Sequence, residues 1–151
     1  MPVSGVRKLG GKQRLQEALA GHLLRWPKTV EQARKWLEKH KAGKQEAEEI
    51  LSDLILAGFL NDSLYARLFV EGHSSWGADR LRHELKRRGI DAALAAAAIE
   101  EGADPGAAED LVREWRKNGV DDRKIAGRLA RRGFPSREAW KAMNSSCPGA
   151  E

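Results

Sequence analysis

The chain has 151 residues, of which 41% are hydrophobic and 32% charged, so it is long enough for one domain and too apolar for a disordered segment. Its net charge of +5 favours an anionic partner such as nucleic acid or an acidic protein surface, although a well-solvated helical surface has the same balance. A single cysteine, Cys147, excludes a disulfide framework and a cysteine-rich zinc site within this sequence. Residues 94–99 lie in the longest apolar run, residues 92–99, which is far shorter than a membrane span. We therefore expect a soluble, cytoplasmic protein.

Apolar residues recur at intervals of three and four along the chain, which is the spacing of one helical face. Strand signals are nearly absent, because Val, Ile and Thr are scarce and no long window alternates apolar with polar residues. The apolar faces fall, in chain order, within residues 15–23, 33–37, 47–55, 65–70, 78–85, 94–99, 108–115, 125–129 and 139–143. The sequence therefore predicts an all-α fold of about nine short helices.

Residues typical of helix ends separate these segments. The Trp26-Pro27 pair predicts the end of the first helix, because a residue before proline avoids the helical conformation. Thr29 and Gln32 have the spacing of a capping box. Aspartates are expected to cap three further helices, and glycines to end most of them. These residues are Asp62, Asp91 and Asp121, and Gly43, Gly58, Gly77, Gly89, Gly102, Gly119 and Gly133.

An internal repeat is visible in the second half of the chain. Residues 80–90 and 124–134 align without a gap, and both read basic, apolar, three variable residues, Leu, one variable residue, then Arg-Arg-Gly-apolar. A weaker copy lies nearer the start of the sequence. There Ala33 and Leu37 take the places that Leu81 and Leu85 have in residues 80–90. In this copy, Lys41-Ala42 replaces the Gly-apolar turn. A fixed period of this size predicts tandem three-helix repeats stacked into an elongated, curved array, which we expect to be monomeric. The predicted repeats are 12–60, 61–103 and 104–144, between flexible segments 1–11 and 145–151.

The Arg-Arg-Gly sequences have a structural explanation and a functional one. Cations near a helix C-terminus complement the helix dipole, and glycine adopts the left-handed conformation that follows. This accounts for the cations at the helix ends but not for Arg80, Arg82 and Lys124, which lie one or two turns earlier. Two parallel rows of cations on stacked repeats would suit a repeating anionic partner.

No catalytic constellation is present in the sequence. The four histidines form no i, i+4 pair, and there is no HExxH, P-loop or GxGxxG motif, so we expect neither an enzyme nor a metal or cofactor site. The aromatic residues on apolar helical faces are predicted to anchor the core. They are Trp36, Tyr65, Phe69, Trp115 and Trp140. Trp26 and Trp76 lie at helix boundaries, and their burial is left open.

Several motifs resemble a known family. Residues 58–62, Gly-Phe-Leu-Asn-Asp, are followed by Tyr65-Ala66 and Phe69-Val70, and then by residues 76–90, Trp-Gly-Ala-Asp-Arg-Leu-Arg-His-Glu-Leu-Lys-Arg-Arg-Gly-Ile. This block looks like the signature of the RecX family of recombination regulators. The order of the repeats is also similar, and the resemblance covers roughly residues 14–144.

The resemblance implies tandem three-helix repeats that bind the RecA recombinase along the groove of its filament. It further implies restraint of strand exchange and co-protease activity, a role in DNA repair, homologous recombination and the SOS response, no cofactor and, in some members, direct binding to single- or double-stranded DNA. The candidate partner-binding residues are Trp76, Arg80, Arg82, Lys86, Arg87, Arg88, Lys124, Arg128, Arg131 and Arg132.

The chain departs from the family pattern at three places. Ala78 stands where members often have proline, residues 72–75 replace a segment that is often rich in arginine, and Lys41-Ala42 replaces the usual turn. The second departure lowers the number of cations in the second repeat.

The alternative to a RecA-binding regulator is a stand-alone nucleic-acid-binding module with Arg82, Lys86 and Arg128 on phosphates. The affinity of such a module for nucleic acid would fall steeply with salt.

Overall fold

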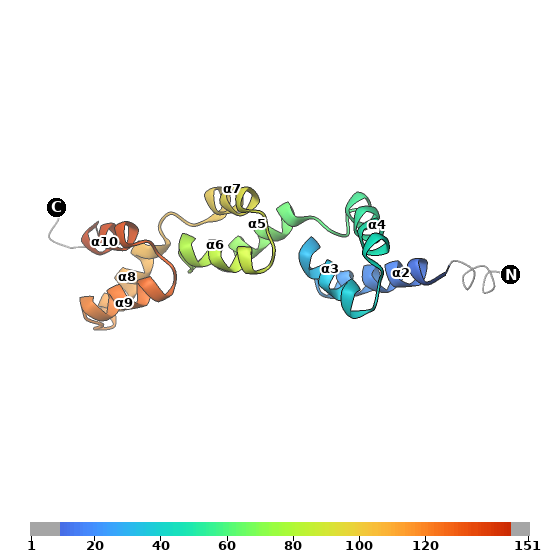
Figure 1. Ribbon diagram of the computed structural model, residues 1–151. Helices are drawn as coiled ribbons and strands as arrows, with labels where there is room; N and C mark the ends of the chain where they lie inside the picture. Colours follow the sequence, from blue (N-terminus) through green and yellow to red (C-terminus); the bar gives the residue numbers. More distant parts are fainter. Residues whose placement is uncertain (1–9, 146–151) are drawn as a thin grey trace. The chain divides into compact units, whose positions relative to one another are not determined.

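The computed structural model describes residues 10–145, and over that range it contains nine helices and no strand (Figure 1). The helices are α2 (Gly10–Arg25), α3 (Val30–Lys39), α4 (Lys44–Leu56), α5 (Asp62–Gly72), α6 (Ala78–Arg87), α7 (Ala92–Gly102), α8 (Ala107–Lys117), α9 (Asp122–Arg131) and α10 (Ser136–Ser145). The all-α prediction is therefore confirmed.

The flexible segments predicted at the two ends lie almost entirely outside the described residues. At their inner limits the structure differs, because Gly10 and Gly11 belong to α2 and Ser145 belongs to α10. A salt bridge of 2.8 Å between Lys12 Nζ and Glu49 Oε2 holds the first turn of α2 against α4. The end of α2 at Arg25 agrees with the prediction from the Trp26-Pro27 pair.

The chain divides into two compact units. The first unit holds the residues up to Tyr65 together with Arg88–Ile90, and the second holds Ala66–Arg87 and the residues from Asp91 onward. The boundary therefore falls inside α5, and three residues after α6 belong to the unit that contains α3.

The core of the first unit lies between α2, α3 and α4. Nine buried apolar residues form it, and they are Leu19, Leu23, Ala33, Leu37, Ala47, Ile50, Leu51, Leu54 and Leu60. The predicted capping box starts α3: Thr29 Oγ1 accepts from the Gln32 N–H at 3.1 Å, and Gln32 Oε1 accepts from the Thr29 N–H at 3.1 Å. Burial of one face and satisfaction of the first N–H groups together explain this helix.

Two sets of ion pairs connect the helices of the first unit. The hydrogen bond from the Lys12 ammonium lowers the pKa of the Glu49 carboxyl, and the same bond raises the pKa of Lys12. Because the folded-state pKa of Glu49 is lowered, the stabilisation from this exposed pair is present above the ordinary glutamate pKa and is lost as pH falls. Arg34 joins α3 to α4 through Glu48 and also contacts Glu31 within α3.

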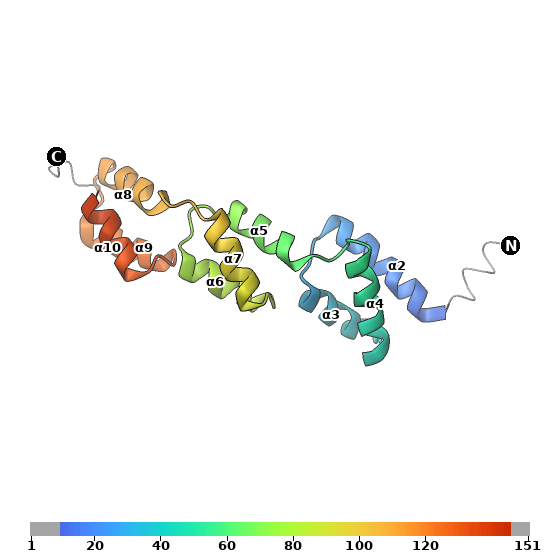
Figure 2. The same ribbon diagram turned by 90° about the horizontal axis from the view of Figure 1, so that it is seen from above.

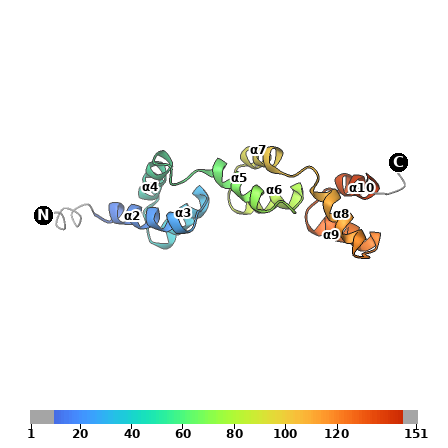
Figure 3. The ribbon, with the colours of Figure 1, turned by 180° about the vertical axis from the view of Figure 1, so that it is seen from behind.

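The second unit contains α6 packed beside α7, and a cluster formed by α8, α9 and α10 (Figures 2 and 3). The buried core of the three-helix cluster consists of Ala107, Ala108, Val112, Ile125, Leu129, Phe134 and Ala142. Asp121 caps α9 as predicted, since its Oδ1 accepts from the Lys124 N–H at 2.9 Å. Asp91 caps α7 in the same way, with Oδ2 3.1 Å from the Ala93 nitrogen.

The predicted cap of α5 is wrong by one residue. Asn61 Oδ1 accepts from the Leu64 N–H at 3.0 Å, so Asn61 caps α5. Asp62 is the first residue of the helix, and its Oδ1 accepts from the Val30 N–H at 2.9 Å, at the first residue of α3. Asp62 therefore satisfies a free N–H of another helix of the first unit, a contact that local sequence patterns do not reveal.

The predicted aromatic anchors divide into two groups. Phe69 is 9% exposed, and Trp36 and Trp115 are half-buried against the two cores. Tyr65 is half-buried and its hydroxyl accepts a hydrogen bond from Arg88 Nη1 at 2.7 Å. The prediction for Trp140 is wrong, because this side chain is 68% exposed. The buried residue of α10 is Ala142, with Ala139 and Met143 beside it, which places Trp140 on the solvent side of the helix.

This difference predicts unequal effects of two tryptophan substitutions. Trp115→Ala removes a half-buried ring that packs against the core of α8, α9 and α10, and it should lower the free energy of unfolding by about 2 kcal/mol. Trp140→Ala should change it by less than about 0.5 kcal/mol, as expected for an exposed side chain. Urea unfolding followed by circular dichroism measures both, and equal losses would contradict the burial described here.

Candidate functional site

The Arg-Arg-Gly sequence of the third predicted repeat forms a turn that packs against the start of α6. The Gly77 N–H donates to the Arg132 carbonyl at 2.7 Å, and the Asp79 N–H donates to the Gly133 carbonyl at 2.9 Å. The two backbones approach so closely that a Cβ at Gly77 would lie under 3.0 Å from backbone atoms of Gly133 and Phe134. Gly133 has φ +91°, and a Cβ there would overlap Arg80. Both glycines are therefore required by packing.

The Arg-Arg-Gly sequence of the second predicted repeat makes the equivalent contact within the first unit. Thr29 Oγ1 donates to the Arg88 carbonyl at 2.5 Å, and Thr29 is fully buried. A Cβ at Gly89 would overlap the side chain of Glu31. We call Arg88–Ile90 and Arg132–Phe134 the docking turns, since each turn packs against the N-terminus of a helix far away in the sequence. The corresponding turn after α3 has no glycine, and Lys41 takes the left-handed conformation there, with φ 62°.

Half of the predicted partner-binding residues are partly buried in contacts of their own unit. The Arg80 guanidinium lies 3.8 Å from the centre of the Trp76 ring. Arg128 and Arg132 both lie 5.4 Å from the centre of the Trp115 ring. The half-buried group is Trp76, Arg80, Arg88, Arg128 and Arg132, and the exposed group is Arg82, Lys86, Arg87, Lys124 and Arg131.

Trp76 belongs to a column of rings in the second unit. His73 stacks on Phe69 at 4.2 Å between ring centres, and Trp76 lies 4.1 Å from His73. The imidazole is held by a hydrogen-bond contact of 2.8 Å between His73 Nδ1 and the Phe69 carbonyl. With Arg80 over its ring as well, Trp76 serves the packing around the start of α6.

Two of the three exposed cations of α6, Arg82 and Arg87, have carboxylate partners on the same helix. Arg82 lies 3.0 Å from Asp79, and Arg87 lies 3.4 Å from Glu84. Both pairs have i, i+3 spacing on an exposed surface, where an ion pair contributes only tenths of a kcal/mol. They nevertheless neutralise part of the charge of the α6 face.

The exposed cations of α9 have no such partners. Within residues 10–145, no carboxylate lies within ion-pair distance of Arg123, Lys124 or Arg131. The acids at the start of the helix are engaged elsewhere: Asp121 caps the helix, and Asp122 pairs with Arg116 at 3.2 Å. The three cations surround a shallow depression of about 480 Å³, together with Asp121 and Gly127. Arg123 and Gly127 were missed from the sequence, although their spacing from Lys124 and Arg131 was visible there.

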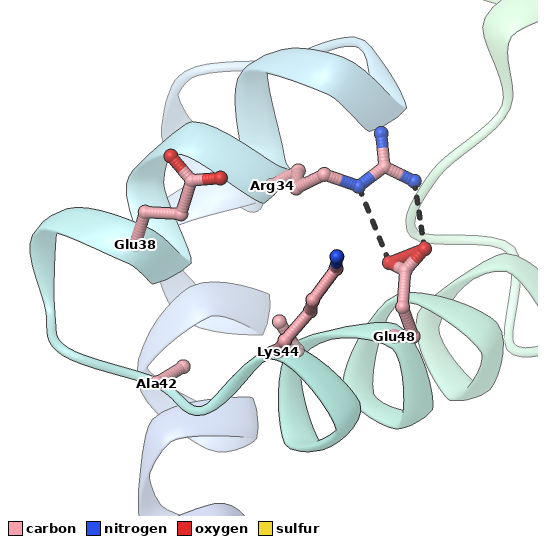
Figure 4. A pocket seen from close by; sticks show the side chains of 6 residues that line it. Arg34, Glu38, Ala42, Lys44 and Glu48 are labelled. Carbon is pink, nitrogen blue, oxygen red and sulfur yellow. Dashed lines mark hydrogen bonds and ion pairs between the residues drawn. The ribbon is translucent and has the colours of Figure 1, made fainter.

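A second depression, of about 280 Å³, lies between α3 and α4 of the first unit (Figure 4). Arg34 Nε and Nη2 donate to the two carboxylate oxygens of Glu48 at 3.2 and 3.1 Å, and this pair closes one side of it. Lys44 and Glu38 stand at its rim, and Ala42 and Ala47 contribute apolar surface. Arg34 and Glu48 pair with each other, and Lys44 and Glu38 add one charge of each sign, so the depression does not favour one ligand charge.

Two other kinds of site are absent from the described part of the chain. Between residues 10 and 145, no group of three or more His, Cys, Asp or Glu side chains is arranged to hold a metal ion. In the same range, no helix combines the length and the apolar character needed to cross a lipid bilayer.

Comparison with solved structures places the fold among known helical arrays. The crystal structure of RecX from Lactobacillus salivarius superimposes with a TM-score of 0.80 at 19% identity, over 89% of this chain and 96% of that one. A second crystal structure, of a regulatory protein RecX, gives a TM-score of 0.75 at 17% identity, over 95% of this chain and 76% of that one. These similarities establish the all-α helical-repeat fold.

Sequence comparison gives more specific relatives. Residues 61–99 match the family model of the second three-helix domain of RecX. The regulatory protein RecX of Lactobacillus delbrueckii is 29% identical over 83% of this chain, but this chain covers only 44% of its length. Those of Amycolatopsis mediterranei and Streptomyces coelicolor are each 33% identical, over 77% and 80% of this chain and 73% and 70% of their own lengths. With this identity over most of both chains, the protein belongs to the RecX family of regulatory proteins.

Proposed function

We propose that this chain binds the filament of the RecA recombinase on single-stranded DNA and restrains strand exchange and co-protease activity. It acts by binding rather than by catalysis, as a cytoplasmic monomer without a cofactor, in homologous recombination, DNA repair and the SOS response. Membership of a family of regulatory proteins supports the regulatory part of the proposal. The observation that carries the binding part is the exposed face of α9, where no carboxylate among residues 10–145 pairs with Lys124 or Arg131.

The ten candidate residues take two roles in this proposal. The exposed cations Arg82, Lys86, Arg87, Lys124 and Arg131 contact the filament directly. The half-buried residues Trp76, Arg80, Arg88, Arg128 and Arg132 support those contacts, because they pack the docking turns and the helices next to them. Arg80 is therefore unsuitable for a test by charge reversal, since its side chain covers Trp76 and adjoins Gly133.

The test is co-sedimentation with RecA filaments on single-stranded DNA. We expect the double variant Lys124→Glu/Arg131→Glu to bind filaments at least tenfold more weakly than the parent, a loss of about 1.4 kcal/mol or more. The matched control is Lys35→Glu/Lys39→Glu on α3, which makes the same charge change at two exposed positions and should bind within about twofold of the parent. Equal binding by the parent and the α9 variant would show that the filament contacts another face. Absence of co-sedimentation by the parent would refute the proposed partner.

The alternative function is a stand-alone nucleic-acid-binding module. Two measurements distinguish it from the proposed function: the salt dependence of the affinity, and whether tight binding requires RecA. A phosphate binder loses affinity with a slope of roughly −0.7 per contact on single strands and binds naked DNA as well as filaments. A regulator of the filament requires RecA for tight binding.

The proposed monomeric state is tested separately, by measuring the molecular mass of the protein in solution by sedimentation equilibrium.

A further inference from the structure

The solvent-facing side of α4, in the first unit, combines carboxylates with a strongly exposed leucine. Leu56 is 86% exposed, more than any other large apolar side chain of the described residues. Asp53 and Glu49 lie three and seven residues before it, on the same side of the helix. Glu49 pairs with Lys12, whereas no cation in the described part of the chain lies within ion-pair distance of Asp53. We call Glu49, Asp53 and Leu56 the acidic face of α4.

The solvent-facing side of α10, in the second unit, has the opposite charge. Trp140 is 68% exposed, and its helix neighbours Arg137 and Lys141 are exposed as well. Among the residues that the structure describes, no carboxylate lies within ion-pair distance of either cation. The buried residue Ala142 lies on the other side of the helix, toward the core. We call Arg137, Trp140 and Lys141 the basic face of α10.

The two faces match in charge and in spacing. On each helix two like charges lie four residues apart, which is about 6 Å at 1.5 Å per residue. These pairs are Glu49 with Asp53, and Arg137 with Lys141. Each pair lies beside one exposed apolar side chain, Leu56 on α4 and Trp140 on α10. An apolar anchor, most often an aromatic ring, with charges at its rim is the usual composition of a protein–protein contact.

Both halves of this match are present in one chain, which selects a second copy of the chain as the partner. Because the two faces differ, the contact is heterologous, and each copy that uses one face keeps the other face for a further copy. Exposed ion pairs contribute only tenths of a kcal/mol each, so the contact is too weak to assemble free chains at micromolar concentration. Copies bound side by side have a much higher effective concentration, at which a weak contact forms.

We propose that neighbouring copies of this chain contact one another, with the basic face of α10 of one copy on the acidic face of α4 of the next. Trp140 packs against Leu56, and the two cations pair with Glu49 and Asp53. The proposal rests on the proposed function, because the filament brings the copies together. A bound copy then raises the affinity for the next copy, so the chain binds filaments cooperatively.

Carbodiimide cross-linking tests the contact without RecA, because this reagent joins a carboxylate to a lysine ammonium that touches it. An equal mixture of unlabelled chain and chain labelled with heavy nitrogen is cross-linked at about 1 mM, where contacts of this strength are populated. Mass spectrometry then separates links between copies from links within one copy. We expect mixed-isotope links from Lys141 to Glu49 and Asp53. Absence of these links, or their presence only within single copies, would overturn the proposal.

Charge reversal on each face gives a sharper test. Asp53→Lys and Arg137→Glu should each reduce the link between Lys141 and Glu49 at least tenfold, since like charges then meet. An equal mixture of the two variants should restore the link between copies to within about threefold, because the reversed faces attract each other. Lys117→Glu on α8 is the matched control and should cross-link as the parent does. Failure of the mixture to restore the link would contradict the pairing of these faces.

The apolar part of the contact is tested on RecA filaments. The parent should bind with a Hill coefficient clearly above 1, and Leu56→Ser or Trp140→Ser should lower it to about 1. Leu24→Ser on α2 is the matched control, because Leu24 is 76% exposed and lies outside both faces. Circular dichroism should show the same helical content for all three variants. A Hill coefficient that these two serine substitutions leave unchanged would show that Trp140 and Leu56 do not meet.

The two sets of measurements distinguish this proposal from the proposed function. If the parent binds filaments without cooperativity and forms no link between copies, the contact is wrong and the regulatory function stands. If the parent forms the predicted links between copies and does not bind filaments, the contact stands and the proposed function fails.

Discussion

Gly133→Ala is expected to lower the free energy of unfolding by about 4 kcal/mol, which is a large part of the stability of a typical domain. The substitution adds the strain of a side chain at φ +91° and an overlap with the backbone and Cβ of Arg80. Relief of the overlap would separate the docking turn from α6 and break the hydrogen bonds from Gly77 and Asp79. Each of these bonds contributes roughly 1 kcal/mol. Urea unfolding followed by circular dichroism measures the loss.

Gly119→Ala is the matched control for this prediction. Gly119 also follows a helix and has φ +80°, but a Cβ there would meet nothing within 4 Å. It should therefore show the conformational strain alone, about 1 kcal/mol. Similar losses for the two variants would mean that the close approach between Gly133 and Arg80 contributes nothing to stability.

Thr29→Val is expected to destabilise the first unit by about 3 kcal/mol. The hydroxyl of Thr29 caps α3 and donates to the Arg88 carbonyl, and the residue is fully buried. Valine keeps the shape but removes the cap, worth about 1 kcal/mol, and leaves the partly buried Arg88 carbonyl without this donor at a further cost of about 1–3 kcal/mol. Hydrogen exchange at the amides of α3 and thermal unfolding both report this loss.

Thr29→Ser retains the hydroxyl and removes only a methyl group, so it should cost about 1 kcal/mol. A serine variant as unstable as the valine variant would show that the methyl packing, and not the hydrogen bonds, holds the docking turn at α3.

The helices and most of their caps could be predicted because the signals are local. Thr29 with Gln32, Asp91 and Asp121 act on N–H groups two or three residues away, which their spacing shows directly. Asn61 and Asp62 could not be distinguished, because both suit a helix start and the choice depends on a contact with Val30. The prediction that Trp140 is buried was wrong for a related reason. In a helix of ten residues with few apolar side chains, the sequence pattern does not determine which side of the helix is buried.

The basic residues were found from the sequence, but their division into two groups was not. The helix-dipole explanation of the Arg-Arg-Gly sequences was incomplete, since those sequences also form the docking turns. Their partners, Thr29 and Gly77, lie too far along the chain for any local pattern to indicate. Gly127 lines the depression on α9, and repeat alignment passes over this residue because the alignment compares what the repeats share. Within the described residues, the α9 cations have no carboxylate partner because Asp122 forms its ion pair with Arg116, and the sequence does not show that pairing.

The docking turns also bear on the order in which the protein folds. Thr29 and Arg88 are 59 residues apart in the sequence, whereas the core of α8, α9 and α10 forms within one short stretch of chain. Local contacts close small loops at low entropic cost and form early, and contacts between distant residues form later. Substitutions at the docking turns should therefore accelerate unfolding and leave the folding rate nearly unchanged. The docking turns would then determine the unfolding rate, and so the lifetime of the native state, while the helical cores determine the folding rate.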